Sequence, residues 1–378
     1  MKTGINRKMI AAAAVTAAVV IAALCLGRVK RTSMVNRTGA TFEKGVVQEI
    51  LQDNLNEDGT RAGDQKVAVL MNTGVRKGKT VEMNSSSGYL FGAVCKKGMH
   101  VVVMQSVSGK TTISSVYSPD RGQVLILFGV LYLLAVCLVG GRQGVRASAG
   151  LLFTGAVILY IWIPLICLGF SPIATAVLIC AAATALTFWC IGGICTKTVA
   201  ATAGTVAGVV IAGVMAAVFS KATGVSGWNV SDIEALLTIY QTNRVQVGEL
   251  LFAGILISAL GAQMDVAMSI SSSMQEICRQ NPEIGRRELV HAGMRIGRDM
   301  MGTDSNTLIL AFVGTSVSQL VLNFAYDLPV LQVLNSNNIG ICVMQGLSGS
   351  FGIILSVPAT VQIAACLLRH SCVRPCGG

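Results

Sequence analysis

Asp265 is an acidic residue well inside an apolar stretch, Leu250–Ser272, in the third nearest its C-terminal end, and it is the first candidate for chemistry. It belongs to a set of small and polar residues that recur at steps of three and four: Gly254, Ser258, Gly261, Asp265, Ser269 and Ser272. Residues at this spacing lie on one face of a helix. A carboxylate inside a bilayer is costly unless it is paired, hydrated or protonated, and such acids often relay protons. The pattern indicates a proton-handling group; a structural acid that pairs with an arginine or reaches interfacial water is an equal alternative.

The next apolar segment, Asn306–Ala325, shows a matching stripe of small and polar residues: Thr303, Thr307, Ala311, Gly314 and Ser318. We expect the two stripes to pack together, because small residues let helices approach closely in a membrane. Asp265 would then lie near Asp299, Asp304 or Asn306, and carboxylates held close together favour sharing a proton. The candidate residues for transport or proton handling are Asp265, Asp299, Asp304, Asn306, Gln263, Ser269 and Thr307.

Other catalytic or metal-binding patterns are weak. The run Gly74–Thr80 resembles a phosphate-binding loop, but three residues separate its glycines where four are required, so we interpret it as a basic β-turn. The histidines, His100, His291 and His370, are far apart in the chain, and none of the twelve cysteines forms a C-x-x-C pair. We therefore expect no enzyme, no metal site and no cofactor.

The composition favours a membrane protein. Hydrophobic residues make up 53% of the chain and charged residues 12%, about half the charge that soluble domains carry. The net charge of +11 raises nucleic acid as a partner. Aromatic residues are only 5%, and no basic–aromatic interleaving or zinc-finger spacing is present, so we expect a lipid bilayer and no nucleic acid as the partner.

Eight apolar segments are long enough to cross a bilayer, which needs about 20 residues in a helix. The last exceeds one crossing, and Gly346, Gly349, Gly352 and Pro358 can break or bend it. The first could be a cleaved signal peptide, although we favour a retained anchor. The segments are Met9–Leu26, Val124–Gly140, Ala149–Phe170, Pro172–Cys195, Thr198–Phe219, Leu250–Ser272, Asn306–Ala325 and Ile339–Leu368.

The lysines and arginines of the short loops predict the orientation. With the N-terminus in the cytoplasm, thirteen of them face the cytoplasm and only Lys221 and Arg244 lie in short outer loops. This is the bias expected of cytoplasmic loops. We therefore place both termini, residues 1–8 and 369–378, in the cytoplasm, and residues 124–368 form a membrane domain of seven helices.

Residues 27–123 form an extracytoplasmic domain that follows the anchor, residues 9–26. Short β-branched runs alternate with turn signals, and we expect strands over Thr41–Leu51, Lys66–Met71, Thr80–Asn84, His100–Gln105 and Thr111–Tyr117. Five short strands suggest a small barrel of the OB type, and an irregular β-sandwich fits nearly as well.

Small residues at four-residue steps predict helix contacts. The segment Thr198–Phe219 carries Ala200, Gly204, Gly208, Ala212 and Ala216 on one face. This face packs within the protein or against another copy or a related membrane protein. The glycines expected at helix contacts are Gly204, Gly208, Gly254, Gly261 and Gly314.

The runs LFAGILISALGAQMDVAMSI (Leu251–Ile270), GRDMMGT (Gly297–Thr303) and NTLILAF (Asn306–Phe312) resemble the YibE/F family of bacterial membrane proteins. The resemblance covers roughly Val124–Leu368. Gln263 and Asp304 depart from its apolar pattern and add polarity near Asp265. The resemblance implies a multi-pass protein of the bacterial plasma membrane and does not specify an activity.

Two functions fit these features. The intramembrane acid and the polar stripes favour a transporter or permease of a small molecule or ion, proton-coupled through Asp265. The barrel attached to an anchor favours a membrane scaffold or envelope assembly factor that binds a partner outside the membrane. An intramembrane enzyme is disfavoured, because no apolar segment carries a nucleophile with a matching base.

Overall fold

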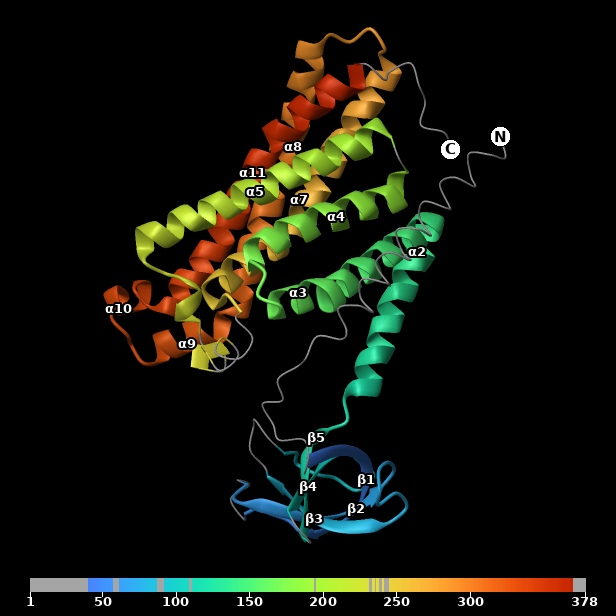
Figure 1. Cartoon of the computed structure of the whole chain (residues 1–378), viewed down its shortest axis with the longest axis vertical. Coiled ribbons are helices and arrows are strands. Elements are labelled where there is room, and N and C mark those ends of the chain that lie inside the picture. Colours follow the sequence, from blue (N-terminus) through green and yellow to red (C-terminus); the bar gives the residue numbers. More distant parts are fainter. Residues whose placement is uncertain are drawn as a thin grey trace. The chain divides into compact units, whose positions relative to one another are not determined.

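The computed structural model describes residues 40–56, 61–86, 92–108, 111–193, 195–230, 233–234, 236–237, 240 and 245–369 (Figure 1). The predicted N-terminal segment, the anchor at residues 9–26 and most of the C-terminal tail lie outside these residues. The chain divides into two compact units within one helix, between Val136 and Cys137.

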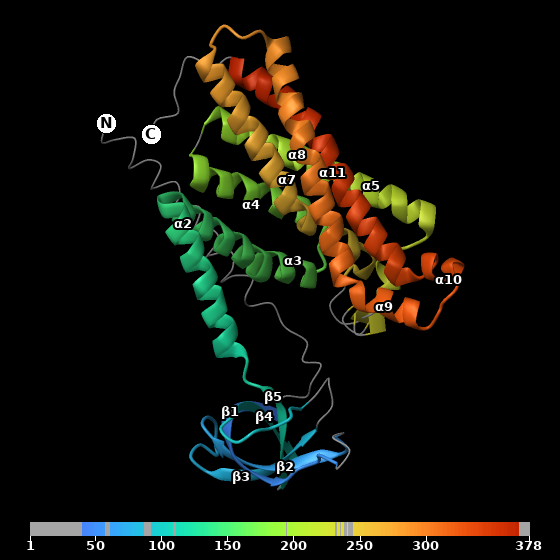
Figure 2. The ribbon, with the colours of Figure 1, turned by 180° about the vertical axis from the view of Figure 1, so that it is seen from behind.

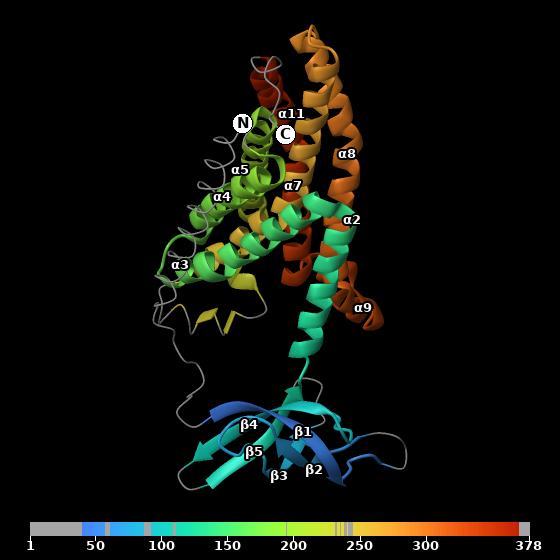
Figure 3. The ribbon, with the colours of Figure 1, turned by 90° about the vertical axis from the view of Figure 1, so that its right-hand side faces the viewer.

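The first unit contains a closed barrel of five strands in the order β1–β2–β3–β5–β4 (Figure 3). All neighbouring pairs are antiparallel except β3 and β5, which are parallel. The predicted five-stranded barrel is therefore confirmed, and the irregular sandwich is not formed. The strands are β1 (Ala40–Gln52), β2 (Asp64–Met71), β3 (Thr80–Ser86), β4 (His100–Ser108) and β5 (Thr111–Pro119).

The barrel closes around valines, because alternate residues of a strand point to the same side. Val47, Val67, Val69, Val101 and Val103 are all fully buried in its core. The run Gly74–Thr80 forms the turn between β2 and β3, where Gly78 donates a hydrogen bond to the carbonyl of Met71 at 2.8 Å. This is the basic β-turn that the glycine spacing predicted.

An ion pair joins the first strand to the segment that leaves the barrel. Lys44 Nζ lies 2.8 Å from Asp120 Oδ2, two residues before the first described helix. The hydrogen bond from Lys44 holds the pKa of the Asp120 carboxyl below its ordinary value. The pair therefore favours the charged carboxylate, and it fixes the end of β5 against β1.

The second unit is helical, and α2 joins it to the barrel. Its helices are α2 (Gly122–Val157), η1 (Ile158–Trp162), α3 (Ile163–Cys167), α4 (Pro172–Gly192), α5 (Thr196–Thr223), η2 (Gly227–Asn229), α7 (Val247–Gln280), α8 (Arg286–Thr315), α9 (Val317–Ala325), α10 (Val330–Leu334) and α11 (Asn337–Arg369). Helices α7, α8 and α11 lie side by side (Figure 2), and α5 packs along both α7 and α11.

Five described helices are long and apolar enough to cross a membrane, or six if α8 and α9 form one bent span. The sequence predicted seven spans in this part of the chain. The difference between six and seven spans arises in Gly122–Cys167, which counts as one helical stretch of 46 residues and contains two predicted segments. Gly141 interrupts it with non-helical backbone angles, φ 52° and ψ −131°. The apolar helices are compatible with a membrane location.

The seventh predicted segment is bent, which the sequence analysis did not anticipate. Helices α8 and α9 meet at an angle of 58° around Ser316. The N–H of Ser316 reaches the carbonyls of Phe312 and Val313, and the Thr315 hydroxyl also bonds the Phe312 carbonyl at 2.8 Å. The bond to Phe312 continues the α-helical pattern, whereas the bond to Val313 and the Thr315 hydroxyl bond span only three residues, so the last turn of α8 tightens and the helix ends there.

The last helix, α11, is continuous, so its glycines do not break it. They allow close contacts: an added Cβ at Gly349 would lie 2.5 Å from Leu308 Cδ2, and one at Gly352 would lie 2.8 Å from the carbonyl oxygen of Gly208. The small face of α5 is buried along its length, including Ala200, Ala212 and Ala216. The predicted packing face of this helix is therefore confirmed within the chain.

Gly204→Ala should destabilise the helical unit, because the new Cβ would lie 2.0 Å from Thr360 Oγ1 on α11. We expect a loss of about 1–3 kcal/mol, the usual range for overpacking a core. Gly254→Ala is the matched control on α7, since nothing lies within 4 Å of its Cβ. There alanine should stabilise the helix by about 0.5–1 kcal/mol. Thermal unfolding of the purified chain in detergent measures both effects. Equal melting temperatures for the two variants would contradict the close packing of α5 against α11.

Candidate functional site

Asp265 and Asp304 form the acidic pair of the helical unit. Asp265 lies in the middle of α7 and Asp304 lies on the neighbouring α8, close enough for their carboxylates to interact electrostatically. Asp265 is exposed at the surface of the bundle, whereas Asp304 is half-buried. The Oδ2 atom of Asp304 is buried and has no hydrogen-bond partner among the described residues. The two carboxylates therefore influence one another, and no ion pair among the described residues includes either of them.

The two small-residue stripes do not pack together, which corrects the expectation from the sequence. Gly254, Ser258 and Gly261 of α7 are exposed. So are the members of the second stripe, which are Thr303, Thr307, Ala311 and Gly314 of α8 and Ser318 of α9. A Cβ added at Gly254, Gly261 or Gly314 would have no described atom within 4 Å. Helix α7 instead buries Ile255, Leu256, Val266 and Ile270, where van der Waals packing of large side chains holds helices together in a bilayer.

The other predicted candidates stand apart from the pair. Asp299 and Asn306 are exposed, and within the described residues neither side chain forms a hydrogen bond or ion pair. Thr307 donates its hydroxyl to the Thr303 carbonyl at 2.9 Å, a bond within α8. Ser269 is half-buried on α7, one turn after Asp265. The structure thus brings Asp265 and Asp304 together and leaves Asp299 and Asn306 outside.

Gln263 occupies a different environment, the crossing of three helices. It is fully buried, and its amide lies against Gly208 of α5 and Gly352 of α11. A Cβ at Gly352 would lie 2.3 Å from the Gln263 Nε2 atom, so only glycine leaves room for this side chain. Neither amide atom has a hydrogen-bond partner in the part of the chain that the structure describes. An unsatisfied buried group of this kind costs about 1–3 kcal/mol.

Further hydroxyl groups are buried without described partners around the same helices, and the sequence analysis did not identify them. They belong to Ser271 of α7, Ser305 of α8, and Ser348 and Thr360 of α11. Thr360 lies against Gly204, one helical turn along α5 from the Gly208 that contacts Gln263. Buried polar groups without a partner are uncommon in native proteins, so these hydroxyls mark polar positions inside an apolar bundle. Their only signal in the sequence is a serine or threonine inside an apolar helix.

Glu249, at the first turn of α7, has a structural role. Its Oε2 atom accepts a hydrogen bond from the Ser171 hydroxyl and lies 3.5 Å from the backbone nitrogen of Ile173. Ser171 and Ile173 begin α4, where an acidic group is favourable beside the free N–H groups. Glu249 therefore ties the start of α7 to the start of α4. Among the described residues, no group of three or more histidine, cysteine or acidic side chains could hold a metal ion.

A protein-family model described as YibE/F-like protein matches residues 128–370, which is more than half of the chain. The chain belongs to the YibE/F-like family. The match confirms the resemblance carried by the α7 and α8 residues, and it covers the acidic pair and Gln263 but not the barrel. No curated protein and no solved structure matches this YibE/F-like chain.

Gln263→Met should make the helical unit more stable, because methionine has a similar volume and removes an amide with no described partner. We expect a gain of about 1–3 kcal/mol. Gln65→Met is the matched control in the barrel. Gln65 is equally buried, but its amide accepts a bond from Cys95 N at 2.7 Å and donates to Asp53 at 2.8 Å, so this change should destabilise. Thermal unfolding in detergent gives both values, and a lower melting temperature for Gln263→Met would mean that the amide binds a water molecule or ligand.

Proposed function

We propose that this YibE/F-like chain is a transporter of the bacterial plasma membrane that moves a small molecule or ion and is driven by protonation of Asp265. The observation that carries the proposal is the interaction of Asp265 with Asp304 between two apolar helices. A membrane protein keeps a carboxylate at this depth only where it is paired, hydrated or protonated. The charged group that interacts with Asp265 among the described residues is a second acid, and no described ion pair includes Asp265, which supports a role in which this carboxyl takes up a proton.

The pair supports a simple proton cycle. With both carboxylates charged, they repel each other across α7 and α8; one proton removes this repulsion and leaves a neutral acid beside one anion. The two states favour different spacings of the helices. The bend between α8 and α9 supports this idea, because interrupted helices line the substrate sites of many transporters. The unpartnered amide of Gln263 and the hydroxyl of Thr360 offer polar groups to a substrate inside the bundle.

The proposed topology has eight spans. The break at Gly141 separates two crossings in Gly122–Cys167, which at 1.5 Å per residue is about 69 Å long, against a bilayer core of about 30 Å. Residues 9–26 supply a retained anchor, both termini lie in the cytoplasm and the barrel lies outside. The distribution of lysines and arginines in the short loops supports this orientation.

A scaffold remains the second candidate, and one surface of the barrel favours it. The rings of Phe42 on β1 and Tyr117 on β5 meet edge to face at 5.1 Å, and both are exposed. Ile113 of β5 is also exposed, at 67%. Exposed aromatic residues grouped in this way are typical of a protein-binding surface.

Asp265→Asn should abolish proton flux through the purified protein in liposomes under an imposed pH gradient with candidate substrates, because asparagine cannot bind and release the proton. Asp304→Asn should reduce the flux by removing the second acid of the pair. Asp299→Asn is the matched control, since Asp299 is exposed and has no described partner. It should transport like the wild type. Flux that persists in a well-folded Asp265→Asn protein would reject this acid as the coupling group.

Complementation in cells distinguishes the transporter hypothesis from the scaffold hypothesis. In a strain that lacks the chromosomal gene, a transporter loses function with Asp265→Asn and keeps it with Phe42→Ser combined with Tyr117→Ser. A scaffold shows the reverse, because its partner binds the exposed aromatic surface and its helices serve as an anchor. Growth or envelope integrity of the complemented strain gives the measurement, with membrane levels of each variant determined alongside.

A further inference from the structure

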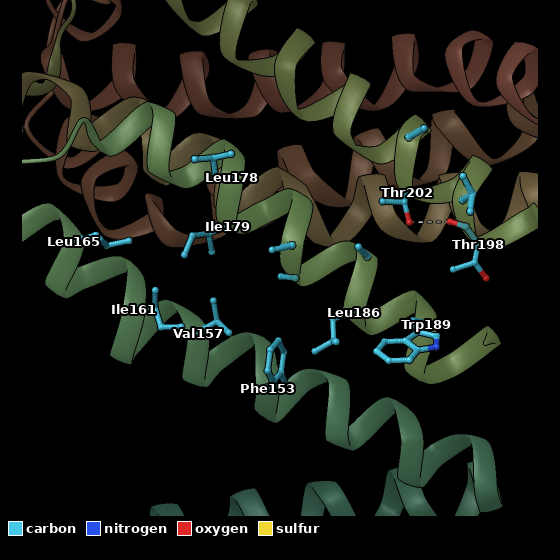
Figure 4. A pocket seen from close by; sticks show the side chains of 15 residues that line it. Phe153, Val157, Ile161, Leu165, Leu178, Ile179, Leu186, Trp189, Thr198 and Thr202 are labelled. Atoms are coloured by element: carbon cyan, nitrogen blue, oxygen red, sulfur yellow. Dashed lines mark hydrogen bonds between the residues drawn. The ribbon is translucent and has the colours of Figure 1, made fainter. Parts of the chain in front are cut away.

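A long apolar groove crosses the helical unit on the side of α2, α3, α4 and α5. Its volume is about 820 Å³, and Figure 4 shows Phe153, Val157 and Ile161 on one wall facing Leu178, Ile179 and Leu186 of α4 on the other. The volume falls in the range of about 300–1,000 Å³ that ligand pockets occupy. The groove is lined by three stretches that are each long and apolar enough to cross a membrane: Gly122–Cys167, Pro172–Cys190 and Thr196–Thr223.

The groove is almost entirely apolar among the described residues, and its polar groups are the indole N–H of Trp189 and two threonine hydroxyls. Two threonines line it, and both hydroxyls are already bonded: Thr198 donates to the Gly193 carbonyl at 2.8 Å, and Thr202 donates to the Thr198 carbonyl at 2.8 Å (Figure 4). Between Phe153 and Leu165 the wall runs for twelve residues, or about 18 Å at 1.5 Å per residue. This is a little more than half of a bilayer core of about 30 Å, which suits a single acyl chain of one leaflet.

One end of the groove is strongly basic. A separate hollow there is lined by Gly140, Arg142, Gln143, Arg146, Gly192 and Lys197. Lys197 directly precedes Thr198 of the groove, its side chain lies beside Gly192, and Arg146 interacts electrostatically with Cys190 at the end of α4. The basic hollow therefore adjoins the apolar groove at the start of α5.

The three cations have no acidic partner in the described chain. None of the ion pairs among the described residues includes Arg142, Arg146 or Lys197. The first turn of α5, which begins at Thr196, adds free N–H groups on the same side. An anion at this position meets three positive side chains and the positive end of a helix.

We propose that this site binds an anionic phospholipid, with the phosphate on Arg142, Arg146 and Lys197 and one acyl chain along the groove. An amphiphile accounts for both parts of the site. A free phosphate would leave the groove unused, and a neutral lipid or an apolar helix would leave three cations uncompensated. Basic hollows between membrane helices are known to suit anionic headgroups. The inference goes beyond the proposed transport, because it involves neither Asp265 nor a substrate.

Lipid retention by the full-length protein in mild detergent tests the proposal. Phosphatidylglycerol and phosphatidylcholine are added in turn, and native mass spectrometry and melting temperature report binding. We expect phosphatidylglycerol to bind and stabilise the wild type, and phosphatidylcholine and inorganic phosphate to do neither. Combining Arg142→Gln, Arg146→Gln and Lys197→Gln should weaken phosphatidylglycerol binding on the order of a hundredfold, since each cation near a lipid surface contributes roughly fivefold.

Two further variants test whether the loss of lipid binding is specific to this site. Arg287→Gln, Arg295→Gln and Arg298→Gln together remove three exposed cations from α8 and should leave binding within about twofold, a difference of only about 0.4 kcal/mol. Ala182→Phe with Ala185→Phe fills the groove, keeps every charge and should also abolish retention. Equal retention of both lipids, stabilisation by inorganic phosphate alone, an unaffected groove-filled variant, or an equal loss in the α8 control would each overturn the proposal.

Discussion

The close crossing of α5 and α11 is the contact on which the helical unit depends. Gly204 and Gly208 of α5 let the two backbones approach closely, and Gly352 of α11 does the same from the opposite helix. Because these positions carry no side chain, the amide of Gln263 and the hydroxyl of Thr360 fit into space that any larger residue would fill. The same glycines therefore provide both the tight packing and the unsatisfied polar interior. A protein selected for stability alone would not retain such groups.

The barrel and the packing face of α5 could be predicted from the sequence, because both depend on local signals. Turn residues between β-branched runs mark strand ends, and small residues at four-residue steps mark a helix face. The same periodicity on α7 was misleading. Gly204 and Gly208 are covered by α11, whereas Gly254 and Gly261 have nothing above them in the described chain. Periodicity identifies a face, and only the three-dimensional arrangement identifies its neighbour.

Other features could not be read from the sequence for related reasons. The bend at Ser316 is accompanied by three-residue hydrogen bonds, from the Ser316 N–H to Val313 and from the Thr315 hydroxyl to Phe312, that tighten the end of α8. The segment had the composition of a single span, so its length concealed the break. Gln263 was recognisable as a polar departure from an apolar family pattern, but its lack of partners depends on α5 and α11, which are distant in the chain. Long-range packing decides these properties.

Helix α7 combines two environments. Gln263 and Asp265 are two residues apart, which places them about 200° apart around the helix axis. Gln263 lies in the buried helix crossing. Asp265 lies on the opposite side of α7, where it interacts with Asp304 of α8. A rotation of α7 driven by the charge of Asp265 would therefore also move the amide of Gln263. In the proposed transport cycle, α7 would link protonation at its surface to the polar groups of the interior.

The closure of the barrel has a consequence for the recognition of extended peptides. Every strand has two neighbours, so no free edge is available for β-augmentation. The ring is closed by β3 and β5, which pair over only two positions, Asn84 with Ser115 and Ser85 with Val116. This short parallel seam is the weakest part of the ring. Parting it would expose two edge strands at once and give an incoming segment a slot that the closed ring conceals.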